Sequence, residues 1–381
     1  MSEDKRICII STIDGTLDSF VIPSARFMKE KGWDVTLVSR MSDSFLMRHK
    51  EEFRCVNVPM ERGVSVKDLL MMPFVFKSLF KKESFDLVQY ATPNASLYAS
   101  LGAKWAGVKK RIYCQWGIRY VGFTGIKRYL FKMVEKLTCM NSTHIRPASW
   151  KNLDFAVNEG LYERRKASVL GDGGTVGVDL KVFDVSLKCS RKQQILEQLP
   201  LLNNKVVFSF VGRVNRDKGI FELLKAYQKI SMEFRDTALL LIGDMEGALP
   251  SCLEDIIVNH NVVMTGATND VPKYLSASDV LVHPSYREGF SMVIQQAMAL
   301  EIPVVTTDIP GPSEVIEPSV SGILAKPQDV ETLYDCMKWM MEHPIDRREM
   351  GRAGRKRCEE KFNRERMLQL FLNDREKILY E

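Results

Sequence analysis

The chain has 381 residues, of which 45% are hydrophobic and 27% are charged, with a formal net charge of +6. This composition is that of a globular protein long enough for two domains. The longest apolar run, near residues 69–76, is interrupted by a proline and is too short to span a bilayer. Because the polar start MSEDKR does not resemble a signal peptide, we expect a cytoplasmic protein.

The eight cysteines are scattered, and none form a C-x-x-C pair or a zinc-binding spacing. We expect them to be reduced core residues. The charge is uneven, because residues 1–180 hold 28 Lys and Arg against 19 Asp and Glu, whereas the remainder holds 26 against 29. Between residues 101 and 170 there are 14 basic residues and only four acidic ones. Such a region can bind nucleic acid, an anionic membrane or a phosphorylated substrate, or it can be a solvated basic face.

In chain order, residues 6–10 predict a buried strand, followed by a loop with Gly15 at its centre and a helix over 21–31. Gly32 ends that helix before a second strand, which is the start of a doubly wound α/β unit. Further strands are predicted at 53–58, 87–90, 111–115 and 168–170, and helices at 67–81, 95–106, 126–138 and 150–159. Hydrophobic and basic residues are interleaved over 125–137, which indicates an amphipathic helix that could lie on a membrane.

The segment GDGGTVG, residues 171–177, comes close to a dinucleotide fingerprint, but Val176 stands where the third glycine belongs. We interpret it as a flexible crossing between two domains. A second α/β unit begins after Asn204. It is predicted to contain strands at 206–211, 238–242, 262–264, 280–283 and 303–306, helices at 220–234, 271–277 and 330–342, and mostly helix from 350 onward.

The motif VGRVNRDKG, residues 211–219, ends a predicted strand and opens a helix. Arg213 and Lys218 flank this turn, close to backbone N–H groups that a helix start leaves unpaired. Two cations at such a place can neutralise a diphosphate and stabilise it as a leaving group. The alternative interpretation is two solvated loop cations.

The stretch LVHPSYREGFSMVIQQAMAL, residues 281–300, is predicted to run from a strand through a loop into a helix capped by Ser291. The start of that helix suits an anion. Glu288 lies too close to this site to be a phosphate ligand, and it is better placed for the hydroxyl groups of a sugar. The alternative is an acidic residue that simply stabilises the helix dipole. Gly311 and Glu314 follow the next strand, on the same edge of the sheet.

Several other chemistries lack their motif. No D-x-D pair of acids occurs, which argues against a metal-bridged diphosphate, so we expect neither a metal nor a cofactor. The spacings of serine hydrolases, Walker A proteins and zinc deaminases are also missing. No nucleic-acid-binding motif accompanies the basic region, so nucleic acid is not an expected partner.

In their order and spacing, these motifs resemble those of the retaining nucleotide-sugar glycosyltransferases of family 4. VGRVNRDKG is similar to that family's V-G-R-(L/V)-x-x-x-K-G, and residues 263–316 are similar to its most characteristic block. The resemblance implies the GT-B fold, an α/β architecture of two facing Rossmann-like domains. Residues 1–180 would form the acceptor-side domain, 200–360 the donor-binding domain, and 361–381 a terminal helix packed back on the first domain.

The resemblance also implies roles for individual residues. Arg213 and Lys218 would hold the donor diphosphate, and Glu288 would contact the donor sugar. The donor-binding positions would further include Gly15, Gly212, Gly243, Thr265, Gly289, Phe290, Ser291 and Gln296. The family signature has a glutamate where Gln296 stands, and many relatives have a histidine where Trp116 stands. We therefore expect altered donor affinity or choice, and no catalysis that depends on that histidine.

The expected function is a retaining, metal-independent transfer of a sugar from a nucleoside-diphosphate donor, with UDP as the expected nucleotide. The expected acceptor is a polyprenyl-diphosphate-linked saccharide, in bacterial capsule or O-antigen synthesis, at the anionic inner face of the membrane. Two alternatives remain open, namely a non-catalytic protein that binds sugar nucleotides and a nucleotide-sugar epimerase.

Overall fold

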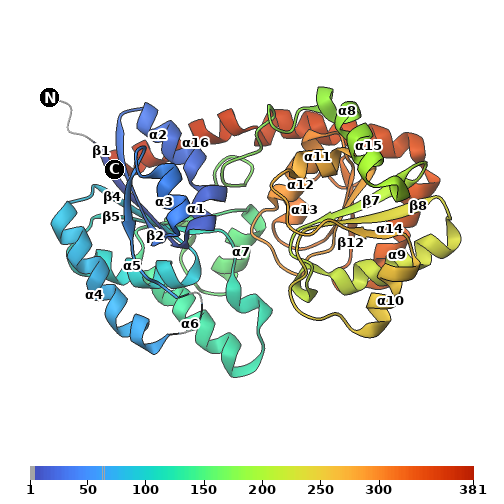
Figure 1. Ribbon diagram of the computed structural model, residues 1–381. Helices are drawn as coiled ribbons and strands as arrows, with labels where there is room; N and C mark the ends of the chain where they lie inside the picture. The colour runs from blue at the N-terminus through green and yellow to red at the C-terminus, as the bar shows by residue number, and fades with distance from the viewer. Residues whose placement is uncertain (1–4, 62, 64) are drawn as a thin grey trace. The chain divides into compact units, whose positions relative to one another are not determined.

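The computed structural model describes residues 5–61, 63 and 65–381, and the chain divides into two compact units (Figure 1). The first unit is Met1–Val176 with Glu365–Glu381, and the second is Gly177–Arg364. Each holds a six-stranded sheet in which the pairs are parallel, with strand orders β3-β2-β1-β4-β5-β6 and β12-β11-β10-β7-β8-β9. These are the same doubly wound topology, which confirms the expected α/β architecture of two Rossmann-like domains.

The elements of the first unit alternate between strand and helix. Its strands are β1 (Lys5–Ile13), β2 (Trp33–Arg40), β3 (Arg54–Asn57), β4 (Leu87–Ala91), β5 (Lys110–Gln115) and β6 (His144–Pro147). Its α-helices are α1 (Asp14–Phe20), α2 (Ile22–Glu30), α3 (Asp43–His49), α4 (Val66–Glu83), α5 (Pro93–Ala106), α6 (Gly125–Asn141), α7 (Trp150–Asn158) and α16 (Arg364–Tyr380), of which α16 begins at the last residue of the second unit.

The second unit repeats this alternation. Its strands are β7 (Val206–Val211), β8 (Thr237–Ile242), β9 (Val262–Met264), β10 (Val280–His283), β11 (Val304–Thr307) and β12 (Gly322–Ala325). Its helices are α8 (Lys188–Gln198), the 3-10 turn η5 (Arg216–Lys218), α9 (Ile220–Glu233), α10 (Ser251–Asn259), α11 (Val271–Ser276), α12 (Met292–Ala299), α13 (Pro312–Val315), α14 (Val330–Glu342), α15 (Pro344–Arg357) and the π-helix η6 (Cys358–Phe362).

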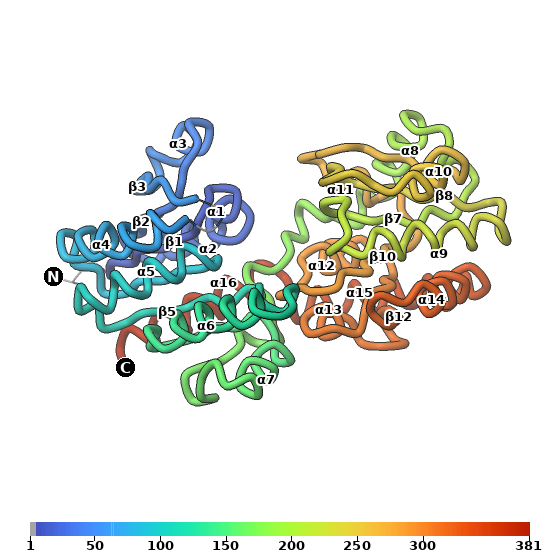
Figure 2. Tube along the Cα trace, turned by 90° about the horizontal axis from the view of Figure 1, so that it is seen from below, coloured from blue at the N-terminus to red at the C-terminus, as the bar shows by residue number. Residues whose placement is uncertain are grey.

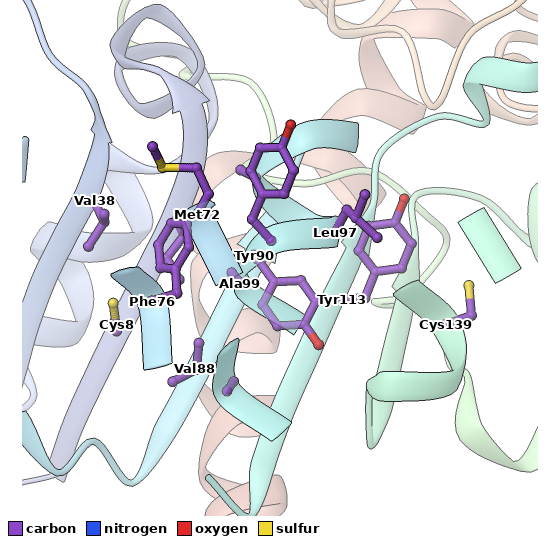
Figure 3. Packing of buried hydrophobic residues seen from close by; sticks show 14 of the residues in the cluster. Cys8, Val38, Met72, Phe76, Val88, Tyr90, Leu97, Ala99, Tyr113 and Cys139 are labelled. Atoms are coloured by element: carbon purple, nitrogen blue, oxygen red, sulfur yellow. The ribbon is translucent and has the colours of Figure 1, made fainter. Parts of the chain in front are cut away.

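Two apolar layers cover the first sheet. On one face, α4, α5 and α6 pack over β4 and β5, and Figure 3 shows Phe76 of α4 in the same cluster as Tyr90 and Tyr113 of the sheet. On the other face, α1, α2 and α16 pack over β1 and β2. The fully buried Arg375 of α16 donates from Nε and Nη2 to Oε1 of Gln89 on β4, at 2.9 and 2.7 Å. The C-terminal helix is therefore part of the first unit's core.

Some elements differ from the sequence-based expectation. The strand predicted at 168–170 is wrong, because the sixth strand of the first sheet is β6, whose HIRP sequence has too few apolar residues to be recognised. The loop predicted around Gly15 is also wrong, because β1 continues to Ile13 and Gly15 lies in α1. Besides β6, the elements α3, α8, α10, α13 and β12 were not predicted.

The boundary between the two units and the absence of a membrane-spanning helix among the described residues complete the description of the fold. The GDGGTVG segment contains the point at which the first unit ends and the second begins, between Val176 and Gly177. Among residues 5–61, 63 and 65–381, no helix combines the length and the apolar character needed to cross a bilayer.

Candidate active site

The switch point of the second sheet lies between β7 and β10, where the strand order reverses. Both strands are buried at their paired positions, where Val280 and Leu281 of β10 lie opposite Phe208 and Ser209 of β7. In open α/β sheets, ligands bind outside the carboxyl ends of the strands at such a point. The two loops that leave it are the β7–α9 loop, with Arg213 and Lys218, and the β10–α12 loop, with Glu288 and Ser291. Sequence reasoning and topology therefore select the same place.

The β7–α9 loop is tightly wound. Asn215 accepts a hydrogen bond from the backbone N–H of Lys218 at 3.1 Å and so caps the short turn η5. Gly219 follows with φ +73°, a left-handed conformation that glycine adopts without strain. A Cβ atom at Gly219 would overlap the carbonyl group of Pro284, whose carbon would lie 2.7 Å away. The two loops of the switch point are therefore in direct backbone contact.

The β10–α12 loop ends at the predicted cap. The side chain of Ser291 accepts from the N–H of Ile294 at 3.5 Å, which confirms Ser291 as the N-cap of α12. Gly311, with φ +94°, packs so closely that a Cβ atom there would lie 2.9 Å from the carbonyl carbon of Gly289. Phe290 is 8% exposed, and its ring meets that of Phe362 in the π-helix with centroids 5.4 Å apart. The loop is thus held from two sides.

Lys218 and Glu288, which are 70 residues apart in the sequence, form an ion pair between Nζ and Oε1. Their side chains are 22% and 19% exposed. Burial alone would raise the pKa of Glu288, but the ammonium of Lys218 and a hydrogen bond from His283 hold that pKa well below its usual value. Ser285 also donates to Oε1, at 3.2 Å. Glu288 is therefore an ionised carboxylate held by its neighbours.

Arg213 lies in the same loop but is much more exposed, at 64% of its side chain. Its Nη1 is 2.5 Å from Oε2 of Glu246, a residue of the loop after β8, and Nδ2 of Asn215 donates to the same oxygen at 2.6 Å. Each of the two predicted diphosphate cations thus has a carboxylate partner in the structure. Exposed ion pairs are worth little, so the Arg213 pair can open at small cost when an anion binds.

The remaining predicted donor-binding residues follow strands at the same edge of the sheet, except for Gln296, which lies within α12, and Gly15, which belongs to the first unit. Gly243 forms a bridge with Gly266 next to Thr265, whose hydroxyl donates to the carbonyl of Gly266 at 2.8 Å. Gly212 follows β7 directly. Gln296 is half-buried on α12, beside the fully buried Gln295.

Sequence reasoning gave no role to His283, Ser285 or Glu246, although all three contact predicted site residues. His283 looked like the end of an apolar strand, and its position before a proline was the only available signal. Glu246 lies 33 residues from Arg213, and no local pattern links the two. In the part of the chain that the structure describes, no group of three His, Cys, Asp or Glu residues could hold a metal ion.

Trp116, at the carboxyl end of β5, belongs to the first unit. Its ring lies against that of Phe20 with centroids 5.5 Å apart, and it lines a small pocket with Arg146, Thr175 and Phe371. Trp116 is therefore part of an aromatic pair at the carboxyl edge of the first sheet.

Two protein families match the chain. Residues 191–357 match "Glycosyl transferases group 1", and residues 6–148 match "Glycosyl transferase 4-like". The chain is 28% identical over 341 residues to the capsular polysaccharide biosynthesis glycosyltransferase CapM of Staphylococcus aureus, with 88% of each chain covered. It is 25% identical to an α-1,3-galactosyltransferase of Escherichia coli named for UDP-Gal and GlcNAc-diphosphoundecaprenol, with 80% of this chain and 79% of the relative covered.

Solved structures confirm the fold. A glycosyltransferase from Rickettsia africae superposes with a TM-score of 0.82 at 18% identity, covering 99% of both chains. Anabaena HepE in complex with UDP superposes with a TM-score of 0.79 at 16% identity, covering 98% of this chain and 100% of that one. At these identities the likeness concerns the fold alone, and it confirms the GT-B architecture.

Proposed function

The chain is a glycosyltransferase that carries the group 1 and 4-like domains of the GT-B enzymes, and from this premise we propose its reaction. We propose that it transfers a sugar, with retention of configuration and without a metal, from a UDP-sugar to a polyprenyl-diphosphate-linked saccharide. The observation that carries the proposal is the convergence of Lys218 and Glu288 at the switch point of the second sheet. A cation suits the diphosphate there, and a carboxylate suits sugar hydroxyl groups.

The proposed roles follow from exposure and charge. Lys218 stabilises the negative charge that develops on the leaving diphosphate. Arg213 is exposed enough to leave Glu246 and turn to the same phosphates. Glu288 is ionised, so it accepts hydrogen bonds from the donor sugar while Lys218 and His283 hold its Oε1. We further propose that the leaving phosphate accepts the proton of the attacking acceptor hydroxyl, as the bond from the sugar carbon to the phosphate oxygen breaks.

Relatives support the proposed substrates. The names of the Escherichia coli relative and of a Campylobacter jejuni relative, which is 24% identical over 345 residues, both specify a diphosphoundecaprenol-linked acceptor. We therefore propose the same class of lipid-linked acceptor for this chain, with a place in surface polysaccharide synthesis.

A donor panel tests this proposal. UDP-glucose, UDP-galactose and their N-acetylamino counterparts would be incubated with a polyprenyl-diphosphate-linked acceptor and with EDTA, and the product mass would be recorded. We expect one hexose or N-acetylhexosamine to be added. Donor binding without transfer to any acceptor would favour the non-catalytic alternative, and an isomerised donor sugar would favour the epimerase alternative.

Gln296 provides a sharper test of the donor site. We expect Gln296→Glu to keep transfer and to lower the donor KM by about three- to tenfold, because a carboxylate accepts stronger hydrogen bonds from ribose hydroxyls than an amide does. Initial rates against donor concentration would measure this. The matched control is Gln295→Glu, which places a carboxylate at a fully buried position and should lower stability instead. Loss of transfer in Gln296→Glu would exclude the ribose contact.

We also propose that the first unit contacts an anionic membrane surface. The exposed face of α6 carries a continuous apolar stripe of Ile126, Tyr129, Leu130, Met133, Leu137 and Met140. A similar stripe on α4 comprises Val66, Leu69, Leu70 and Phe74. Helix α5 packs between α4 and α6, so the stripes belong to one layer of the unit, as Figure 2 shows. Exposed apolar surface of this size beside basic residues is typical of a membrane-binding face.

The charges beside the α6 stripe are partly used within the protein. Lys132 and Arg128 lie 2.8 and 3.5 Å from Glu159, whereas Lys127 lies over the ring of Phe123 and Lys136 is exposed. The apolar side chains are therefore the better targets. We expect Ile126→Ser with Leu130→Ser to weaken binding to anionic liposomes at least about tenfold, because two side chains lose their burial in the bilayer.

Flotation with vesicles of stated anionic content would measure that loss. Val258→Ser in the second unit is the matched control, because Val258 is 80% exposed and Ile126 is 79% exposed. Equal binding of the double variant and the control protein would remove α6 from the proposed membrane contact.

A further inference from the structure

His283 is a buried residue behind the proposed sugar contact. It is the last residue of β10, it is 1% exposed, and the hydroxyl of Thr306 on β11 donates to its carbonyl at 2.9 Å. Its backbone is therefore fixed by the sheet. A histidine at the end of an apolar strand is often only a core residue, so the contacts of its ring decide whether it has a further role.

Three site oxygens surround a single ring nitrogen of His283. The Nε2 atom lies 3.3 Å from Oε1 of Glu288, 3.3 Å from Oγ of Ser285 and 3.2 Å from Oγ of Ser291. These residues are the proposed sugar contact, a donor to that same carboxylate, and the N-cap of α12. One imidazole thus links the two features of the loop that would face the donor.

The other ring nitrogen indicates which form of the ring is present. Nδ1 is buried, and it has no hydrogen-bond partner among the described residues. A proton there would be a buried donor without an acceptor, which is costly. The proton of the ring is therefore placed on Nε2, where the ionised Oε1 of Glu288 lies 3.3 Å away and can accept it.

We propose that His283 is a positioning residue that sets the orientation of the Glu288 carboxylate relative to the α12 N-terminus, and so tunes recognition of the donor sugar. This inference rests on the proposed function, because it requires Glu288 to meet the sugar. Lys218 and Ser285 also bind Oε1, but Lys218 approaches with the end of a long side chain and Ser285 with a single hydroxyl, whereas His283 places a rigid, buried ring there from a backbone that the sheet holds. Removing the ring should leave the carboxylate bound by Lys218 but less well oriented.

The test compares binding of a UDP-sugar with binding of UDP. We expect His283→Leu to weaken the binding of the best donor in the panel by about tenfold relative to the binding of UDP. A hydrogen bond to a charged group contributes a free energy of about this size. His283→Gln carries an N–H group near the former Nε2 position and should recover most of the loss. A general loosening of the fold would weaken the binding of UDP and of the UDP-sugar equally. The ratio of the UDP-sugar affinity to the UDP affinity therefore reports the positioning effect alone. Calorimetric titration of both ligands gives this ratio.

Two further variants separate the possible failures. Ser276→Ala removes a buried hydroxyl that donates to Pro272 at 2.7 Å, away from the site, and should leave the ratio unchanged. Glu288→Gln should lower the ratio, and adding His283→Leu to it should lower it little further. If Glu288→Gln lowers the ratio and His283→Leu does not, the positioning role is wrong and the proposed function stands. If Glu288→Gln also leaves the ratio unchanged, the proposed sugar contact itself fails.

Discussion

Replacement of Lys218 with methionine should reduce sugar transfer at least about a thousandfold while the protein remains folded. The ammonium of Lys218 is placed to stabilise charge on the leaving diphosphate, and removal of one such group typically costs a hundred- to thousandfold in rate. The same change also leaves the Glu288 carboxylate without its nearest cation. That carboxylate is only 19% exposed, so we expect a further loss from its disturbed ionisation and orientation.

The direction of the pH effect follows from the pKa of Glu288. In the wild-type protein this pKa is lowered, so the ion pair contributes stability at neutral pH that is lost as the pH falls through the folded-state pKa. Without Lys218, the hydrogen bonds from His283 and Ser285 remain but the nearest cation is gone, so burial should bring the pKa of Glu288 above its wild-type value, and the variant should be less stable than the wild type at neutral pH. Thermal unfolding of both proteins from about pH 2 to pH 8 would measure both trends.

Two further variants separate the loss of the diphosphate contact from a loss of stability. Lys218→Met combined with Glu288→Gln should recover stability without recovering transfer, because the buried charge is gone but the diphosphate contact is still missing. Lys229→Met, which breaks the exposed pair with Glu331, should change neither property by much. Turnover within a few fold of wild type in Lys218→Met would show that Lys218 does not act on the diphosphate.

The strands of the second sheet illustrate what local sequence can specify. The predicted bounds of β7, β9, β10 and α14 agree with the structure, because each is a periodic apolar run that ends at a glycine, a proline or a polar turn. The cap at Ser291 was predictable for the same reason, since a serine before an apolar helical run satisfies the first N–H groups. The sheet edge that carries the candidate site followed from these assignments and from the topology rule for parallel sheets.

The contacts within the site could not be predicted in the same way. The pair of Lys218 with Glu288 and the pair of Arg213 with Glu246 join residues on different loops, and their formation depends on which strands become neighbours. β6 was missed because its short HIRP sequence is buried by its neighbours rather than by its own hydrophobicity. His283 shows the same limit, because a polar side chain becomes informative only when its buried surroundings are known.

The backbone contact between the two loops leads to the second large effect. We expect Gly219→Ala to reduce donor affinity at least about a hundredfold and to lower stability by about 2–4 kcal/mol. The left-handed backbone at φ +73° costs about 1–2 kcal/mol for a residue with a Cβ atom. The overlap with the carbonyl of Pro284 adds the cost of moving backbone against backbone. Because Lys218 precedes Gly219 and Glu288 follows Pro284, any separation of the loops pulls this ion pair apart.

A second glycine with a similar backbone conformation serves as the control. It separates the cost of the left-handed backbone from the cost of pushing the two loops apart. Gly107, which ends α5 in the first unit, has φ +81°, and a Cβ atom there would meet no atom within 4 Å. Gly107→Ala should therefore lose only the conformational part, about 1–2 kcal/mol, and should bind UDP-sugars like the wild type. Denaturant unfolding and donor titration of the two variants, side by side, would measure both quantities. If Gly219→Ala matches Gly107→Ala in both, the loops can yield without disturbing Lys218 and Glu288, and the site does not depend on their close contact.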